Sequence, residues 1–208
     1  MNDMHGNSVK NLRQNLLAQR KQFAAAATYP EIADKLQRQL AAFLVNQGAL
    51  LNAIALYVPI QDEIDLRPTL LAWEKGHSSR KLLLPFARAD QHLDFYLWKE
   101  GDALSPSRHG VPEPDPSNTA RPQHTPDCIL IPCVGWSQST VNGMTRFWRL
   151  GYGGGYFDRT LSVLRQKNPN LLCLGIGFDW QELNDAQWAP QTHDEPLDLL
   201  LTESTLLG

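Results

Sequence analysis

The 208-residue chain lacks the features that mark secreted, disulfide-stabilised or membrane-embedded proteins. It has only three cysteines, Cys128, Cys133 and Cys173, and an odd, sparse set argues against a disulfide framework and for a reducing compartment. No apolar run approaches the ~20 residues needed to cross a bilayer. Residues 1–8 are polar, without the apolar stretch of a signal peptide. We therefore expect a cytoplasmic protein that makes no membrane contact.

An excess of charge of either sign is also missing. The 19 Lys and Arg residues nearly balance the 22 Asp and Glu residues, for a net charge of −3, so nothing global attracts nucleic acid. A chain of this length with no break in composition fits one domain, which buries roughly 70% of its unfolded surface and needs no covalent staple. We expect a single domain over residues 1–208, either a monomer or a homodimer.

The cysteine spacing does not suggest a metal site. Cys128 and Cys133 are five residues apart, which is not the usual Cys-x-x-Cys zinc spacing. Both flank an apolar run, which favours buried structural thiols. A nucleophilic role would need a nearby base that the sequence does not identify.

Helical and strand patterns alternate along the chain. Apolar periodicity predicts helices over residues 8–24, 30–47, 65–75 and 157–167. Ser8 is the expected N-cap of the first, and Gly48 the stop of the second. Short apolar runs predict strands over residues 53–58, 81–85, 93–98, 127–132, 171–178 and 197–202. This alternation favours a three-layer α/β/α fold with a mostly parallel sheet.

Two further segments stand out between the regular elements. Residues 101–126 are rich in Pro, Ser, Asp and His and predict a long loop, either functional or a plain tether. The first helix is basic through Lys10, Arg13, Arg20 and Lys21. For Arg20 and Lys21 we favour solvated surface positions.

The most informative stretch is Arg149-Leu-Gly-Tyr-Gly-Gly-Gly-Tyr-Phe-Asp-Arg159. Its four glycines lie between a strand and a predicted helix, and glycine lets backbone N–H groups approach a ligand closely. The helix N-terminus adds free donors and a positive dipole end. The segment therefore predicts a phosphate cradle in which Arg149 is a bidentate clamp. The segment is neither a Walker motif nor the usual dinucleotide fingerprint. The alternative to a phosphate cradle is a flexible glycine loop.

Asp158 has two interpretations. It is placed to stabilise the start of the helix through the dipole, an effect of up to ~1 kcal/mol. It is also placed to hold Mg²⁺, which takes one or two protein carboxylates together with phosphate oxygens and water. Beside a phosphate cradle we favour the metal.

The chain resembles the 5-formyltetrahydrofolate cyclo-ligase family, also called methenyltetrahydrofolate synthetases. That family's signature is an apolar strand ending in Pro, followed by Arg-Leu-Gly-x-Gly-x-Gly-Tyr-aromatic-Asp. Here Ile131-Pro132 precedes Arg149-Leu-Gly-Tyr-Gly-Gly-Gly-Tyr-Phe-Asp158. Three further blocks agree in order: Lys10-Asn-Leu-Arg13, Tyr57-Val-Pro-Ile-Gln-Asp-Glu-Ile-Asp65 and His193-Asp-Glu-Pro-Leu-Asp198.

The resemblance implies the fold of sugar-phosphate isomerases and CoA transferases. It also implies conversion of 5-formyltetrahydrofolate and ATP, with Mg²⁺, into 5,10-methenyltetrahydrofolate, ADP and phosphate. Arg149 and Tyr156 would be catalytic, and Asp158 and Asp194 would bind the metal. The implied nucleotide contacts are Lys10, Arg13, Arg149, Leu150, Gly151, Tyr152, Gly153, Gly154, Gly155, Tyr156 and Phe157. The implied folate contacts are Val58, Glu63, Trp136, Tyr152 and Tyr156.

The sequence departs from the family pattern at several places, one being that Lys10 and Arg13 lie one residue closer together than in many relatives. Ser137 replaces an Asp, Gly154 replaces a common Lys, and residues 138–148 lengthen the connection into the cradle. That longer connection carries Phe147 and Trp148, which we expect to pack on the body or on a ligand, either as a lid hinged at Gly143 or as a surface elaboration. The alternatives to a cyclo-ligase are a weakly active folate- or nucleotide-binding relative and an isomerase- or CoA-transferase-like enzyme.

Overall fold

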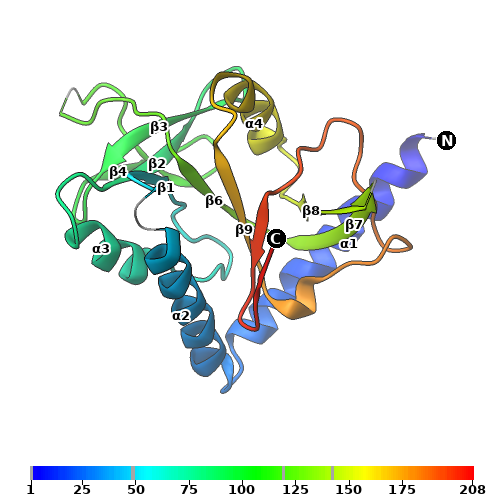
Figure 1. Ribbon diagram of the computed structural model, residues 1–208. Helices are drawn as coiled ribbons and strands as arrows, with labels where there is room; N and C mark the ends of the chain where they lie inside the picture. The colour runs from blue at the N-terminus through cyan, green and yellow to red at the C-terminus, as the bar shows by residue number, and fades with distance from the viewer. Residues whose placement is uncertain (1, 48–49, 119, 142) are drawn as a thin grey trace.

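A computed structural model describes residues 2–47, 50–118, 120–141 and 143–208. Its α-helices are α1 (Asn2–Ala24), α2 (Tyr29–Gln47), α3 (Arg67–Lys75) and α4 (Tyr156–Lys167), drawn in Figure 1. All four predicted helices are present. Ser8 is not an N-cap, because α1 begins six residues earlier and Ser8 lies inside it. Gly48 lies outside the described residues.

One seven-stranded sheet forms the centre of the fold. It contains β1 (Ala53–Ala55), β2 (Lys81–Ala87), β3 (Leu93–Trp98), β6 (Cys128–Pro132), β9 (Leu172–Ile176), β10 (Leu199–Leu201) and β11 (Leu206–Leu207). The order is β11-β10-β9-β6-β1-β2-β3. The five strands from β10 to β2 pair in parallel, and β11 and β3 add antiparallel edges. The predicted mostly parallel sheet is therefore confirmed, although β1 ends three residues earlier than its apolar run.

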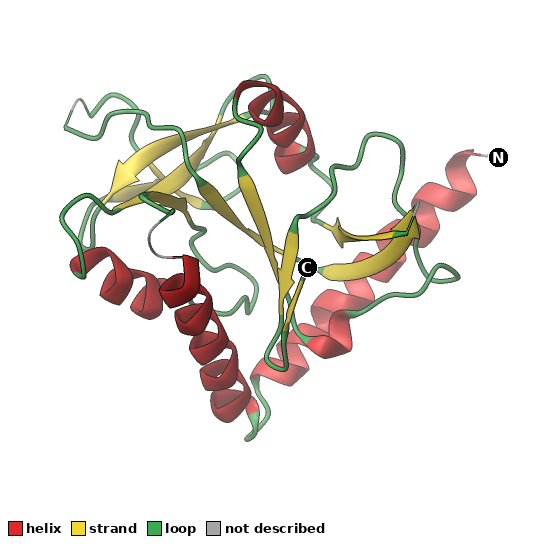
Figure 2. Cartoon of the chain, in the orientation of Figure 1, coloured by secondary structure: helices red, strands yellow, loops and turns green. Residues whose placement is uncertain are grey.

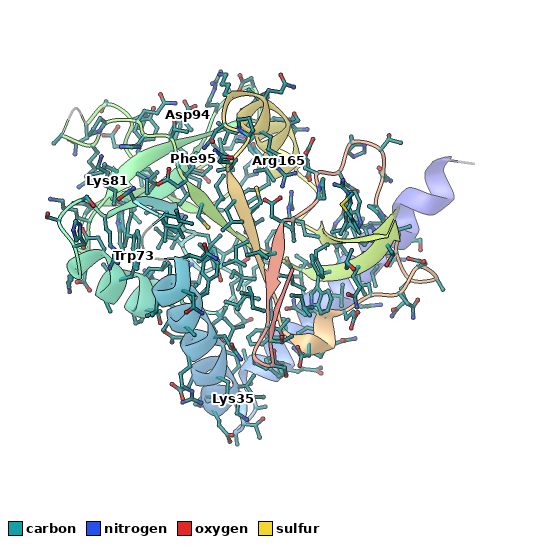
Figure 3. All side chains as sticks on the ribbon, viewed as in Figure 1. Lys35, Trp73, Lys81, Asp94, Phe95 and Arg165 are labelled. Carbon is teal, nitrogen blue, oxygen red and sulfur yellow. The ribbon has the colours of Figure 1, made fainter. Side chains whose placement is uncertain are left out.

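Helices cover both faces of this sheet, as Figures 1 and 2 show. Alternate strand residues point to opposite faces. On one face, Ile54 and Leu130 pack in a cluster with residues of α2 and α3. On the other, Ile129 and Cys173 pack with Leu161 of α4. The two clusters contain Trp73 and Phe95 respectively, both labelled in Figure 3. This arrangement confirms the three-layer α/β/α prediction.

Helix α1 packs outside these two layers. Its buried Leu16 belongs to a third cluster with Val134, Leu150 and Trp188. In Figure 1 the helix runs behind the β7–β8 hairpin, beside the C-terminal half of the chain. Within the described residues, no helix has both the length and the apolar character needed to cross a membrane.

The segment that contains residues 138–148 forms a β-hairpin of β7 (Gly135–Val141) and β8 (Met144–Leu150). The ladder runs without a break from Gly135↔Leu150 to Val141↔Met144. Phe147 is 3% exposed in the α4-side cluster, and its carbonyl accepts the Leu197 N–H at 2.8 Å. Trp148 donates to the Ser139 hydroxyl at 2.9 Å. The predicted packing of both aromatics on the body is confirmed.

The segment 101–126 is not an unstructured loop throughout. It contains a short antiparallel hairpin of β4 (Leu104–Pro106) and β5 (Pro112–Pro114). Proline has no N–H to donate, and it is tolerated in such edge strands because no second neighbouring strand needs that hydrogen bond. Composition alone predicted a loop here because proline is rare in strands, so the hairpin was missed.

All three cysteines are free and buried, and burial was predicted for Cys128 and Cys133. Burial raises the pKa of Cys133 and Cys173 to about 12, and also raises that of Cys128. The thiolate is the nucleophilic form. These residues therefore act as small core side chains.

We predict that Phe147→Ala destabilises the fold by ~3 kcal/mol, because it removes a large buried ring and leaves a cavity. Urea unfolding measures the change. Met144→Ala on the same strand is the control, since Met144 is 59% exposed and its truncation should cost less than ~0.5 kcal/mol. Equal effects of the two substitutions would show that the hairpin is not anchored through Phe147.

Candidate active site

A cavity of about 560 Å³ lies at the carboxyl ends of the parallel strands. Val58 and Ile60 follow β1, Ala87 ends β2 and Pro132 ends β6, and all four line it. In open α/β sheets, ligands bind at this edge. The volume is in the range that holds a small-molecule ligand. Further walls come from α1, the glycine segment, the β4–β5 turn and residues 188–194.

The glycine segment forms one wall and turns into α4. Gly153 has φ +96°, and Gly155, with φ +66°, occupies the N-cap position of α4. The Arg13 guanidinium crosses from α1 and donates from Nε to the Gly151 carbonyl at 2.8 Å. A Cβ at Gly153 would lie 3.3 Å from Arg13 Cζ. Glycine is therefore required both for the backbone conformation and for the approach of the arginine, and the N-terminus of α4 faces the same cavity.

Arg149 lies at the end of β8 and is 8% exposed. Its Nη2 donates to Asp158 Oδ2 at 2.8 Å, and its Cζ lies 5.1 Å from the centre of the Phe157 ring. Among the residues that the structure describes, its Nε has no hydrogen-bond partner. The guanidinium is thus fixed in place without being saturated by the protein.

Two carboxylates line the cavity beside these cations. Asp158 accepts from Arg149 and, through Oδ1, from the Glu195 N–H at 3.3 Å. Asp194 accepts the Gln191 N–H at 2.7 Å. Burial lowers the pKa of Arg13, and the negative charge of Asp194 acts against this shift. Across the described ranges, His, Cys, Asp and Glu form no cluster of three that could hold a metal. Two carboxylates with free lone pairs suit Mg²⁺, which takes its other ligands from phosphate and water.

Glu63 forms the opposite part of the site. It is 9% exposed, and burial raises the pKa of its carboxyl group. Its Oε1 accepts from the Tyr152 hydroxyl at 2.7 Å and its Oε2 from the Ile60 N–H at 3.0 Å. A buried carboxylate is thereby presented at the cavity wall as a fixed acceptor.

The expectation that Arg20 is a surface residue was wrong. Arg20 is 2% exposed and donates to the Tyr152 hydroxyl at 2.5 Å, the Gln61 carbonyl at 3.0 Å and the Cys133 carbonyl at 3.4 Å. Its position was readable in the sequence, because Arg20 lies four residues after the buried Leu16 and therefore on the same helix face. Lys21, as expected, is exposed.

The implied site residues are mostly brought together. Those that line the cavity are Arg13, Val58, Glu63, Arg149, Leu150, Gly151, Tyr152, Gly153, Gly154, Gly155, Tyr156, Phe157, Asp158 and Asp194. Lys10 and Trp136 are not among the described residues that line it. Lys10 is exposed on α1, and Trp136 is 2% exposed in the core, where its Nε1 donates to the Phe178 carbonyl at 2.9 Å. The described residues within 138–148 do not line it either, which does not support a lid.

The β4–β5 turn supplies wall residues that the sequence did not reveal. Ser107, His109 and Glu113 line the cavity. His109 Nε2 lies 2.9 Å from the Tyr156 hydroxyl, which Arg108 also contacts. Burial raises the pKa of Glu113, which is 8% exposed. No motif marks this turn, and only its composition set it apart.

The fold and site together define an α/β domain in which a glycine-rich wall contacted by Arg13 and a buried carboxylate lie in one cavity at the carboxyl edge of the sheet. Residues 5–203 match the 5-formyltetrahydrofolate cyclo-ligase family. The chain belongs to this family of ligases.

Individual relatives agree with this assignment. A protein named 5-formyltetrahydrofolate cyclo-ligase from Mycoplasma pneumoniae is 25% identical over 194 residues, covering 93% of this chain and 98% of the relative. One from Mycoplasma genitalium is 26% identical over 170 residues, covering 80% and 81%.

Two solved structures are also similar. A 5,10-methenyltetrahydrofolate synthetase from M. pneumoniae superposes with a TM-score of 0.64 at 25% identity, covering 92% of this chain and 97% of the other. A 5,10-methenyltetrahydrofolate synthetase from Aquifex aeolicus superposes with a TM-score of 0.67 at 23% identity, covering 96% and 91%, and shows likeness of fold.

The raised pKa of Glu63 predicts how stability depends on pH. The unfolded chain releases this proton near pH 4.5 and the folded chain only at higher pH, so the folded state binds more protons between these values. The free energy of unfolding therefore falls as pH rises through this window. Glu63→Gln removes the titration, so the stability of the variant relative to wild type should increase from pH 4.5 upward. Thermal unfolding at several pH values measures this, and a difference independent of pH would contradict it.

Proposed function

We propose that the protein is an ATP-dependent 5-formyltetrahydrofolate cyclo-ligase that forms 5,10-methenyltetrahydrofolate, ADP and phosphate. One observation carries the proposal beyond family membership. A single cavity holds a cationic glycine cradle suited to phosphate and, on another wall, a buried carboxylate suited to N–H donors. Both halves of a phosphoryl-transfer reaction can therefore bind within reach of each other.

The nucleotide phosphates are assigned to the cradle. Arg13, Arg149, the backbone of the glycine segment and the N-terminus of α4 supply positive charge and N–H donors there. Asp158 and Asp194 would hold Mg²⁺, which when bound supplies charge neutralisation at phosphate oxygens. Phosphoryl transfer depends chiefly on such positioning and neutralisation.

The reduced folate is assigned to the remaining walls. Glu63 accepts hydrogen bonds from pterin N–H donors, and Val58 supplies apolar contact. Tyr152 and Tyr156 lie in the glycine segment, between this wall and the cradle. The Tyr156 hydroxyl is held by His109, which orients it at the junction of the two substrates. We assign no direct contact to Lys10 or Trp136.

In the proposed reaction the formyl oxygen attacks the γ-phosphorus and ADP leaves. The oxygen then departs with the phosphate as N10 bonds to the formyl carbon and gives up its proton to the phosphate, closing the five-membered ring. The phosphorylated formyl group would react with water if exposed, so a cavity that excludes water favours ring closure over hydrolysis. Arg149, which contacts the cradle and is itself buried, is placed to stabilise the transferring phosphoryl group.

The proposal predicts turnover that depends on both substrates. The protein incubated with Mg-ATP and 5-formyltetrahydrofolate should form the methenyl product, followed by its absorbance, with one ADP released per product. Omission of ATP should abolish product formation. Folate binding without product would favour a weakly active binding relative, and absence of both ATP turnover and folate binding would exclude the proposed reaction.

The cradle assignment predicts that Gly153→Ala weakens ATP binding. A Cβ there is strained by φ +96° and crowds Arg13, so we expect at least a tenfold loss of affinity in a binding titration, since ~1.4 kcal/mol corresponds to a factor of ten. Gly101→Ala is the matched control. Gly101 has φ +85° and no atom within 4 Å of an added Cβ, so it carries the same backbone strain away from the cavity. Equal ATP affinity in the two variants would remove Gly153 from the nucleotide site.

A further inference from the structure

A chain of hydrogen bonds behind the cavity links three separate parts of the sequence. Arg20 of α1 donates to the Tyr152 hydroxyl, which follows β8, and Tyr152 donates to Glu63 in the turn after β1. Tyr152 and Glu63 line the cavity, whereas Arg20 is not among the described residues that line it. Arg20 therefore reaches a ligand only through the other two.

The chemistry of these groups fixes the direction of each hydrogen bond. A guanidinium has donors only, so the Tyr152 oxygen must accept from Arg20. The single phenolic proton of Tyr152 is then free to be donated to Glu63 Oε1, 2.7 Å away. The Ile60 N–H, also a donor only, occupies Oε2. Both carboxyl oxygens of Glu63 are thus held as acceptors.

We propose that Arg20 and Tyr152 form a positioning relay, which keeps the Glu63 carboxylate oriented as a hydrogen-bond acceptor for the ligand. The proposal rests on the proposed function, in which Glu63 accepts N–H donors of a reduced folate. Each carboxylate oxygen has two lone pairs, so the relay and the ligand can contact Glu63 at the same time. Arg20 and Tyr152 are positioning residues for this contact.

The electrostatic surroundings of Glu63 agree with this role. Burial raises its pKa, and the Ile60 N–H, the Tyr152 hydroxyl and the Arg20 charge act in the opposite direction. The other titratable groups facing it from the packed segments are Tyr57 and Cys133. The pKa of Tyr57 is raised well above its ordinary value and that of Cys133 is raised to about 12, so both stay neutral near pH 7. Within the relay, the Arg20 guanidinium therefore supplies the positive charge that stabilises the buried Glu63 carboxylate.

The test compares Tyr152→Phe, Arg20→Met and Arg20→Lys with wild type. The control variants are Arg38→Met and Tyr96→Phe, which change the same residue types outside the relay and the cavity wall. The full chain is assayed with Mg-ATP, and kcat/KM for 5-formyltetrahydrofolate is measured from pH 5 to 9. Binding of 5-formyltetrahydrofolate without ATP is titrated over the same pH range. Thermal unfolding confirms that each variant is folded. Tyr152→Phe keeps the ring and its packing.

The relay predicts that the acidic limb of the profile moves upward by about one pH unit in Tyr152→Phe, which loses a hydrogen bond to the carboxylate, and also upward in Arg20→Met, which loses the nearby positive charge. The folate KM should rise by a larger factor than the KM for ATP, and by more than kcat falls, because the relay orients Glu63, which is assigned to the folate and not to the nucleotide. Arg20→Lys should show a smaller displacement, since an ammonium still donates. The controls should superimpose on wild type.

Two results would overturn the relay. One is a profile for Tyr152→Phe and Arg20→Met whose acidic limb superimposes on wild type, whether or not KM rises, because a packing role alone gives that result. The other is folate binding by wild type whose pH dependence the variants leave unchanged. The binding titration separates this outcome from failure of the proposed function: a wild-type protein that binds folate but forms no product refutes the ligase reaction and still tests the relay.

Discussion

Parallel pairing of five adjacent strands is the constraint on which the site depends. Because β10, β9, β6, β1 and β2 run in one direction, the segments that follow them emerge at one edge of the sheet. Val58 after β1, Ala87 at the end of β2 and Pro132 at the end of β6 would not share an edge in an antiparallel meander. The sheet is short here: β1 pairs over only three residues. Its buried faces, and not the number of its hydrogen bonds, fix the edge in place.

The site also places several charges out of water, and each is matched by a partner of opposite sign or by polar backbone. Arg149 pairs with Asp158, and Arg20 is surrounded by two carbonyls and a hydroxyl. An unmatched buried charge is costly, so removal of one partner should destabilise the position of the other. Glu63 is matched only by neutral donors, the Ile60 N–H and the Tyr152 hydroxyl. This difference identifies the carboxylate most dependent on its neighbours, and most open to a ligand that brings further N–H donors.

Sequence patterns were sufficient for the sheet and for most of the cavity wall. Apolar runs located the central strands because strands buried on both faces have few polar positions, and the glycine segment located the cradle because few residues other than glycine adopt the φ of Gly153. Patterns failed where contacts are long-range. Trp136 looked like a stacking residue but lies in the core. The helix face of Arg20 could be read from Leu16, whereas its partners, 41 to 132 residues away, could not. The turn that carries His109 and the strand β5 that carries Glu113 had no local sequence signature.

Helix α1 connects the two halves of the site mechanically. Arg13 and Arg20 are seven residues apart, close to two full turns, so both point from the same face of the helix at a spacing of about 10 Å. Arg13 holds the Gly151 carbonyl and Arg20 holds the hydroxyl of the next residue, Tyr152. The glycine segment is therefore held at adjacent residues by one rigid rod, and Tyr152 in turn holds Glu63. A shift of the cradle toward bound phosphate would move Tyr152 with it. The wall that carries Glu63 and the wall that carries the glycines consequently cannot adjust independently, which is the behaviour a two-substrate site needs in order to hold one reacting atom against the other.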